Sequence, residues 1–181
     1  MRHLQTTGLL FLLCAPAYGQ ACWEHAAQRY GVSADLLYAI SRVESRLNPQ
    51  AVNRSHLART GSYDIGLMQI NSSNLRTLAR YGIQERDLYD PCTNIHVGAW
   101  LLAQYFARHG ATWDGVGAYN AACSQLKGAA CRNTRASYAW QVYRELPSQR
   151  ASQGQPPLSK TMHSPAAQPL QPFAFAARVS P

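Results

Sequence analysis

The sequence predicts a mainly α-helical, single-domain protein, and three observations support that prediction. Apolar residues recur every three or four positions through most of residues 22–146, which is the spacing of amphipathic helices. Breaks in this spacing coincide with glycine, proline and helix-capping side chains. Strand signals are few, and only residues 62–64 suggest a small hairpin.

The start and stop signals define the expected elements in order. Ser33 is a good N-cap for the second helix, and Pro91 suits the first turn of the longest one. Gly31, Gly82 and Gly110 each follow the end of a helical pattern. We therefore expect helices over residues 22–29, 34–46, 73–81, 91–109, 113–120 and 134–145, with a polar loop at 50–64 and a compact apolar run at 66–71.

The first nineteen residues have the features of a secretory signal peptide. A weakly basic start precedes a short apolar run at 8–15, and a small-residue cleavage site, A-Y-G, follows at 17–19. The run is far too short to span a bilayer, and no other stretch approaches the required length, so we expect no stable membrane insertion. Cys14 would be removed with the signal. The expected location is the periplasm.

The composition changes again near the C-terminus. Residues 147–181 contain basic but no acidic side chains and are rich in Pro, Gln, Ser and Ala. Such a segment cannot bury a core, so we interpret it as a flexible basic tail. The globular domain is therefore expected at residues 20–146.

Four cysteines remain after the signal is removed, which allows three disulfide connectivities. Cys123 and Cys131 are close in sequence, which favours a local bridge and leaves Cys22 to pair with Cys92. A metal site is disfavoured because there is no C-x-x-C motif and the histidines lack ligand spacing. We expect neither a metal nor a cofactor.

The chain carries a net charge of +8, which suits an anionic polymer. A bacterial cell wall and a nucleic acid are both polymers of that kind. Because no Arg/Lys cluster is interleaved with aromatic residues, nucleic acid is the weaker alternative.

Glu44 is the acidic residue with the most informative setting. It lies at the edge of the apolar stripe that the second predicted helix presents to the core. Partial burial there would raise the pKa of its carboxyl group and suit it to general acid catalysis. The alternative is an exposed acid that pairs with Arg42 or Arg46.

Separated motifs give Glu44 a chemical context. In chain order these are E-S-R-L-N-P at 44–49, G-S-Y-D-I-G-L-M-Q-I-N at 61–71, D-P-C-T-N-I at 90–95, A-Y-N-A at 118–121 and Tyr138 in the last helix. The residues of these motifs and their order along the chain closely resemble those of the lytic transglycosylases of the soluble (SLT) type. The resemblance covers essentially the whole globular region. The segments at 61–66 and 90–95 look most like small specialised members that open the wall for type III secretion, type IV pili or conjugative transfer.

The resemblance implies a goose-lysozyme-like fold and favours the Cys22–Cys92 pairing. It also implies that Glu44 is the single catalytic acid/base, which cleaves the β-1,4 bond between N-acetylmuramic acid and N-acetylglucosamine. The C6 hydroxyl of the same muramic acid then closes a 1,6-anhydro ring. No water takes part, so the second carboxylate of ordinary glycosidases is dispensable. Asp64 is expected to have a structural role.

The remaining site candidates have expected roles in substrate binding. Met68 and Gln69 would line the sugar groove, Tyr119 would bring its hydroxyl group near Glu44, and Asn120 would bind a sugar. Ser45 could hydrogen-bond Glu44 or the substrate, Tyr138 would point into the same site, and Tyr63 could stack on a sugar face. The alternatives are a core position for Met68, Tyr119 and Tyr138, a helix-end serine for Ser45 and a C-terminal cap for Asn120. The full set of candidates is Ser45, Tyr63, Met68, Gln69, Tyr119, Asn120 and Tyr138.

Three functions remain open from the sequence. The first is a lytic transglycosylase that acts on peptidoglycan glycan strands, as a monomer, beside an envelope-spanning machine. The second is a hydrolytic muramidase on the same fold, in which Asp64 positions a water. The third is a non-catalytic wall-binding component of such a machine.

Overall fold

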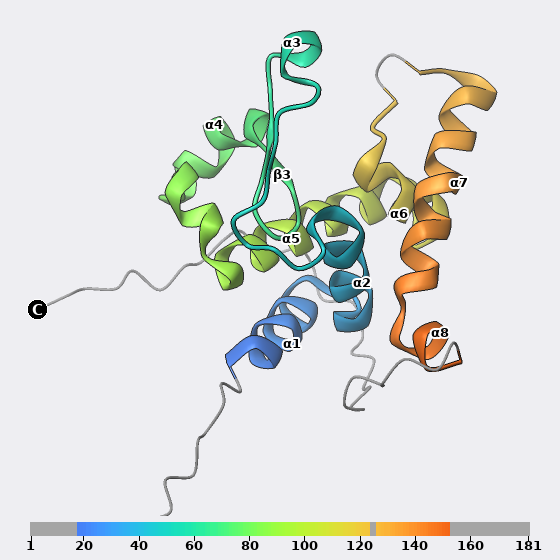
Figure 1. Cartoon of the computed structure of the whole chain (residues 1–181), viewed down its shortest axis with the longest axis horizontal. Coiled ribbons are helices and arrows are strands. Elements are labelled where there is room, and N and C mark those ends of the chain that lie inside the picture. Colours follow the sequence, from blue (N-terminus) through green and yellow to red (C-terminus); the bar gives the residue numbers. More distant parts are fainter. Residues whose placement is uncertain (1–17, 124–125, 153–181) are drawn as a thin grey trace, which may run out of the picture.

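Helices dominate the computed structural model, which describes residues 18–123 and 126–152 (Figure 1). Three short strands lie among them. In chain order the elements are α1 (Tyr18–Tyr30), α2 (Ala34–Ser45), β1 (Val52–Asn53), α3 (Leu57–Thr60), β2 (Asp64–Ile65), β3 (Ile70–Asn71), η1 (Ser72–Asn74), α4 (Leu75–Leu78), η2 (Ala79–Tyr81), η3 (Glu85–Tyr89), α5 (Pro91–His109), α6 (Trp113–Asn120), α7 (Gly128–Glu145) and α8 (Pro147–Ser152). The mainly α fold class is confirmed.

The predicted helix boundaries are reproduced where a capping side chain marks them. The Ser33 hydroxyl accepts a hydrogen bond from the Leu36 amide at 3.3 Å, which starts α2. The Asp90 carboxylate accepts one from the Thr93 amide at 2.8 Å, and Pro91 occupies the first turn of α5. These local contacts fix where the two helices begin.

Several stretches differ from the sequence expectation. The last long helix begins at Gly128, six residues before the expected start, since this stretch lacks the apolar period that would have predicted a helix, although Ala129, Ala130 and Arg132 favour one. The stretch 72–81, expected as one helix, is a single turn of α-helix (α4) flanked by two short 3₁₀ helices (η1 and η2). The polar loop at 50–64 contains β1 and α3, and its end enters β2.

The expected tail also begins differently. Its first six residues, Pro147–Ser152, form α8, which packs against α7. Residues 153–181 of the tail, and residues 1–17 of the expected signal, lie outside the described residues. Helix α1 starts at Tyr18, just before the end of the expected signal.

The three strands form one small antiparallel sheet in the order β1-β2-β3. Val52 pairs with Ile65, which in turn pairs with Ile70. The turn from β2 to β3 therefore holds residues 66–69, part of the G-L-M-Q-I-N motif.

The core lies among α1, α2, α5, α7 and the β2–β3 turn. Helix α5 packs against α1 and α6, while α7 packs against α2 and α6 (Figure 1). The largest fully buried side chains include Leu37, Ile40, Ile65, Met68, Ile70, Leu78, Leu88, Ile95, Leu102 and Val142. This packing brings the C-terminal end of α2 against the middle of α7.

Two disulfide bonds join distant and local parts of the chain. Cys22 in α1 is bonded to Cys92 in the first turn of α5, and Cys123 is bonded to Cys131 in α7. These are the pairs favoured at the sequence level. Across the described part of the chain, no helix combines the length and apolar character that crossing a membrane requires.

Candidate active site

Glu44 occupies the last turn of α2, at the edge of that helix's buried face. Leu37 and Ile40 on this face are fully buried, while Glu44 is half-buried. Arg46 ends the helix in the left-handed conformation. The alternative pairing of Glu44 with Arg42 is not formed, because the Arg42 guanidinium instead donates to the Glu145 carboxylate of α7 at 2.6 Å.

The Glu44 carboxyl group faces a tyrosine from the opposite helix. The Tyr138 hydroxyl of α7 donates a hydrogen bond to Glu44 Oε1 at 2.5 Å. Burial raises the pKa of Tyr138 well above its usual value, and the nearby Glu44 charge raises it further, so Tyr138 stays protonated. The sequence expectation that Tyr138 points toward Glu44 agrees with this contact.

The pKa of Glu44 is raised from 4.5 to about 7. Burial is the largest cause, since it disfavours the charged carboxylate. The hydrogen bond from Tyr138 acts in the opposite direction, and the negative charge of Asp64 raises the pKa further. Near neutral pH a large fraction of Glu44 therefore carries a proton, as a general acid requires.

A pocket of about 550 Å³ opens beside Glu44. Asn120 from the end of α6 forms one part of its wall, and one side of α7 forms most of the rest. The lining is rich in amides and hydroxyl groups, which can bind sugar hydroxyl and acetamido groups. The lining residues are Val43, Glu44, Asn120, Asn133, Thr134, Ser137, Tyr138 and Gln141.

Tyr119 links this pocket to the β2–β3 turn. Its hydroxyl donates to the Met68 carbonyl oxygen at 2.9 Å, and the Glu44 charge contributes to the raised pKa of Tyr119 after burial. Asn94 of α5 also binds this turn. Its Oδ1 accepts a hydrogen bond from the Met68 amide at 2.7 Å. Its Nδ2 donates to the carbonyl oxygens of Ile65 and Leu88.

The structure corrects the expected role of Met68. Its side chain is fully buried rather than lining a groove, because α5 places Gly98 directly beneath it. A Cβ atom at Gly98 would collide with the Met68 sulfur. Met68 therefore acts through its backbone, which accepts from Tyr119 and donates to Asn94.

Ser45 and Gln69 also use their side chains inside the protein. The Ser45 hydroxyl donates to the Leu67 carbonyl oxygen at 2.6 Å, not to Glu44. The Gln69 amide donates to the Gly66 carbonyl at 2.8 Å, and Gln69 has a left-handed backbone with φ of 49°. Both side chains stabilise the loop that carries Met68.

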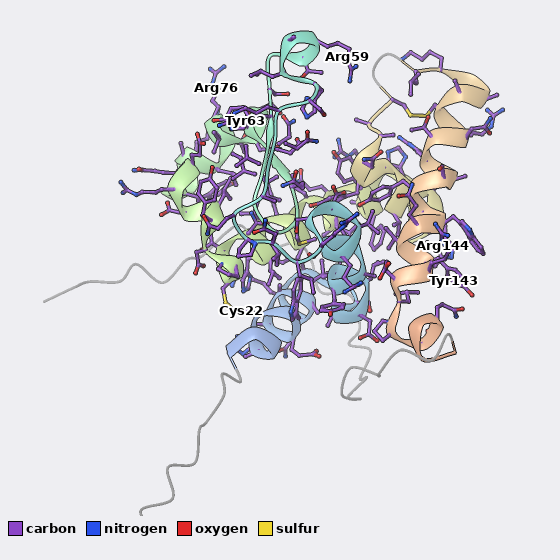
Figure 2. All side chains as sticks on the ribbon, viewed as in Figure 1. Cys22, Arg59, Tyr63, Arg76, Tyr143 and Arg144 are labelled. Carbon is purple, nitrogen blue, oxygen red and sulfur yellow. A yellow bond between two sulfur atoms is a disulfide. The ribbon has the colours of Figure 1, made fainter. Side chains whose placement is uncertain are left out.

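Tyr63 lies apart from the pocket residues. Its hydroxyl donates to Glu85 at 2.7 Å, and the Arg54 guanidinium lies 5.2 Å from its ring centroid. Figure 2 shows its side chain near α4 and the sheet. These contacts occupy its hydroxyl group and the ring face toward Arg54, so the expectation that Tyr63 stacks on a sugar has no support from this geometry.

Asp64 is held in a hydrogen-bond network within the sheet. Its carboxylate accepts from Asn71 at 2.7 Å and contacts His56 Nε2 at 2.7 Å. This is the structural setting expected for Asp64. The described ranges, 18–123 and 126–152, contain no group of three His, Cys, Asp or Glu side chains that could hold a metal ion.

The sequence reasoning missed the polar side of α7. Asn133, Ser137 and Gln141 follow one another at four-residue intervals, and Thr134 precedes Tyr138 by the same interval. This spacing is visible in the sequence, but a polar stripe on a helix is most often a solvated face. Only the fold shows that this side of α7 lines the pocket beside Glu44.

Comparison with known proteins agrees with this geometry. A family model described as the transglycosylase SLT domain matches residues 21–141, which is most of the chain. The chain therefore belongs to the SLT transglycosylase family, and it is a peptidoglycan lytic transglycosylase.

Relatives and a solved structure extend the comparison. The chain is 37% identical over 146 residues to Invasion protein IagB of Salmonella typhimurium, covering 80% of this chain and 89% of IagB. It is 39% identical over 139 residues to Protein IpgF of Shigella flexneri, covering 75% and 87% of the two chains. The lytic transglycosylase Slt from Pseudomonas aeruginosa, solved as an inactive mutant, has the same fold, with a TM-score of 0.57 and 22% identity. That match covers 78% of this chain and 25% of the Slt chain.

Proposed function

We propose that Glu44 is the single acid/base of a ring-closing cleavage of peptidoglycan. The observation that carries this proposal is the half-buried Glu44 carboxyl group, held by Tyr138 at 2.5 Å and with a pKa of about 7. A carboxyl group with this pKa can give up a proton and accept one within the same turnover near neutral pH.

The reaction has two proton transfers through the same carboxyl group. Glu44 first donates its proton to the oxygen that leaves as the bond between N-acetylmuramic acid and N-acetylglucosamine breaks. The resulting carboxylate then accepts the proton of the C6 hydroxyl group, whose oxygen attacks C1 of the same muramic acid. The product is a 1,6-anhydro ring, and Glu44 regains its starting protonation state.

The surrounding residues support this assignment of roles. Tyr138 orients the Glu44 carboxyl group, and Tyr119 holds the loop at Met68 beside it. Asn120 and the polar side of α7 would bind the sugars. Asp64 already contacts Asn71 and His56, so it is poorly suited to activate the water that a hydrolase needs.

We also propose that the enzyme is exported to the periplasm and acts as a monomer beside an envelope-spanning secretion, pilus or transfer machine. One relative carries the name Invasion protein IagB, and the segments at 61–66 and 90–95 resemble specialised family members that open the wall for such machines, which supports this setting. The disulfide bonds Cys22–Cys92 and Cys123–Cys131 suit an oxidising compartment.

Product analysis tests the proposal directly. Purified sacculi digested with the protein are expected to yield anhydro-muramyl ends in mass spectrometry, one water lighter than reducing ends. Glu44→Gln should abolish their release, whereas Glu24→Gln, an exposed acid on α1, should leave it unchanged. Reducing ends alone would identify a hydrolase. Unchanged lysis by Glu44→Gln would show that Glu44 is not catalytic.

A further inference from the structure

A second pocket, of about 430 Å³, lies on the other side of α7 from the Tyr138 side chain. Its lining is mainly aromatic and apolar, and it is formed by α6 and α7. The lining residues are Trp113, Asp114, Arg132, Ala136, Ala139, Trp140 and Tyr143. Nothing in the proposed reaction uses these side chains.

Three aromatic rings form a corner in this pocket. The Trp140 and Tyr143 rings are stacked with centroids 5.1 Å apart, and Trp113 meets Tyr143 edge-on at 5.5 Å. Both tryptophans remain strongly exposed, at 46% for Trp113 and 59% for Trp140. Exposed indoles fixed by ring contacts are unusual on a surface that only faces water.

The two pockets share α7 as a common wall. Arg132, Ala136 and Trp140 line the aromatic pocket, and the residue after each of them lines the Glu44 pocket. Successive residues of a helix are about 100° apart around its axis, so the two sets of side chains point to different sides of α7. Figure 2 shows Tyr143 and Arg144 on the outer side of α7.

The charge around the aromatic corner is positive. Asp114 accepts a hydrogen bond from Arg135 at 2.8 Å, so its charge is balanced within the protein. Arg132 lines the pocket and is exposed, and the exposed Arg144 follows Trp140 by about one helical turn on α7. An occupant that offers both flat apolar faces and carboxylates would complement this surface.

We propose that the Trp113–Trp140–Tyr143 corner is a second binding site for peptidoglycan. A pyranose ring of a glycan strand would stack on the indole faces, and Arg132 and Arg144 would meet the carboxylates of the lactyl groups and stem peptides. The strand bound here is not the one being cleaved. The inference rests on peptidoglycan being the substrate, as proposed above, because a cross-linked wall presents neighbouring strands to both sides of α7.

Such a site would raise affinity for the intact wall through a second point of attachment, without altering the chemistry at Glu44. The two sites can therefore be separated by the substrate used. Insoluble sacculi can occupy both pockets at once, whereas a short soluble glycan needs only the Glu44 pocket.

The binding test uses the full chain with Glu44→Gln as background, so that no turnover occurs. Adding Trp140→Ala, or Arg132→Ala as a milder second variant, is expected to weaken co-sedimentation with sacculi about tenfold. Leu57→Ala, an exposed apolar residue on α3, is the matched control and should bind normally. Unchanged melting temperatures would show that each variant is folded.

The activity test uses Trp140→Ala in the otherwise unaltered chain. Turnover of short soluble glycans should stay within about twofold of the original, while lysis of sacculi falls. Equal sedimentation of Trp140→Ala and the control would overturn the second site. The proposal would also be overturned if the chain self-associates and Trp140→Ala abolishes that self-association. The aromatic corner would then bind a second copy of the chain. Failure of Glu44 as the catalytic group would appear in product analysis and leave sedimentation unaffected.

Discussion

At the scale of single residues, the position of Glu44 in the fold sets the pKa of its carboxyl group. Burial between α2 and α7 raises its pKa to about 7, and the Tyr138 hydroxyl limits that rise by binding the charged form. The same contact holds Oε1 of Glu44 against α7.

This raised pKa makes a prediction about stability. The unfolded chain ionises Glu44 near 4.5 and the folded chain near 7, so the folded state loses stability as the pH rises through that window. Glu44→Gln removes the ionisation. It should therefore be more stable than the original chain by roughly 2–3 kcal/mol at pH 8 and about equally stable at pH 4.

Urea unfolding at the two pH values measures this difference. Glu24→Gln, which changes an exposed acid, serves as the control and should show a difference that does not grow with pH. A gain in stability that is the same at pH 4 and pH 8 would contradict the buried, protonated carboxyl group.

At the scale of elements, the β2–β3 turn is held between two helices. Asn94 of α5 is fully buried and satisfies three backbone groups of this region, and Tyr119 of α6 binds the Met68 carbonyl from the other side. Gly66 begins the turn with φ of 75°, and a Cβ there would collide with Asn94. The turn is therefore positioned by tertiary contacts more than by its own two-residue strands.

Asn94→Ala should accordingly be costly. It leaves the Met68 amide and the carbonyl groups of Ile65 and Leu88 buried without their partner, which we expect to destabilise the protein by about 3 kcal/mol. Thermal unfolding followed by circular dichroism is the measurement. Asn74→Ala, which loses one half-buried bond to the Asn71 carbonyl, should cost at most about 1 kcal/mol. If both variants lose the same amount of stability, the hydrogen bonds of Asn94 are not what positions the turn.

At the scale of the whole molecule, one long-range and one local disulfide bond cross-link the helices of the described residues. Cys22–Cys92 joins α1 to α5 across 70 residues, whereas Cys123–Cys131 closes a separation of only 8. The Cys22–Cys92 bond restricts the unfolded chain more, because the entropy cost of closing a loop grows with the length of the loop.

The two bridges should therefore differ in their effect on stability. Replacing Cys22 and Cys92 together by serine should cost about 4 kcal/mol, and replacing Cys123 and Cys131 should cost about 2–3 kcal/mol. Urea denaturation of both double variants gives the comparison. A larger loss from the local bridge would mean that strain or residual structure, not loop length, dominates.

The sequence by itself determined the fold class and the family, and it pointed to Glu44 as the proposed acid. The starts of α2 and α5 are local signals, because each capping side chain, Ser33 or Asp90, and the amide it binds are three residues apart. The motif around Glu44 is likewise continuous along the chain. Local patterns failed where small residues lack an apolar period, as at the start of α7, and where a 3₁₀ turn replaces a helix.

The tertiary structure alone decided how the site residues are used. Tyr138 and Glu44 are 94 residues apart in sequence, and only the packing of α2 on α7 makes them a hydrogen-bonded pair. Met68 belongs to a recognisable motif, yet the close approach of α5 at Gly98 turns its side chain into the core and leaves its carbonyl for Tyr119. Sequence patterns report which residue types are present. Burial and the distance between helices, which set pKa and contact, depend on the whole fold.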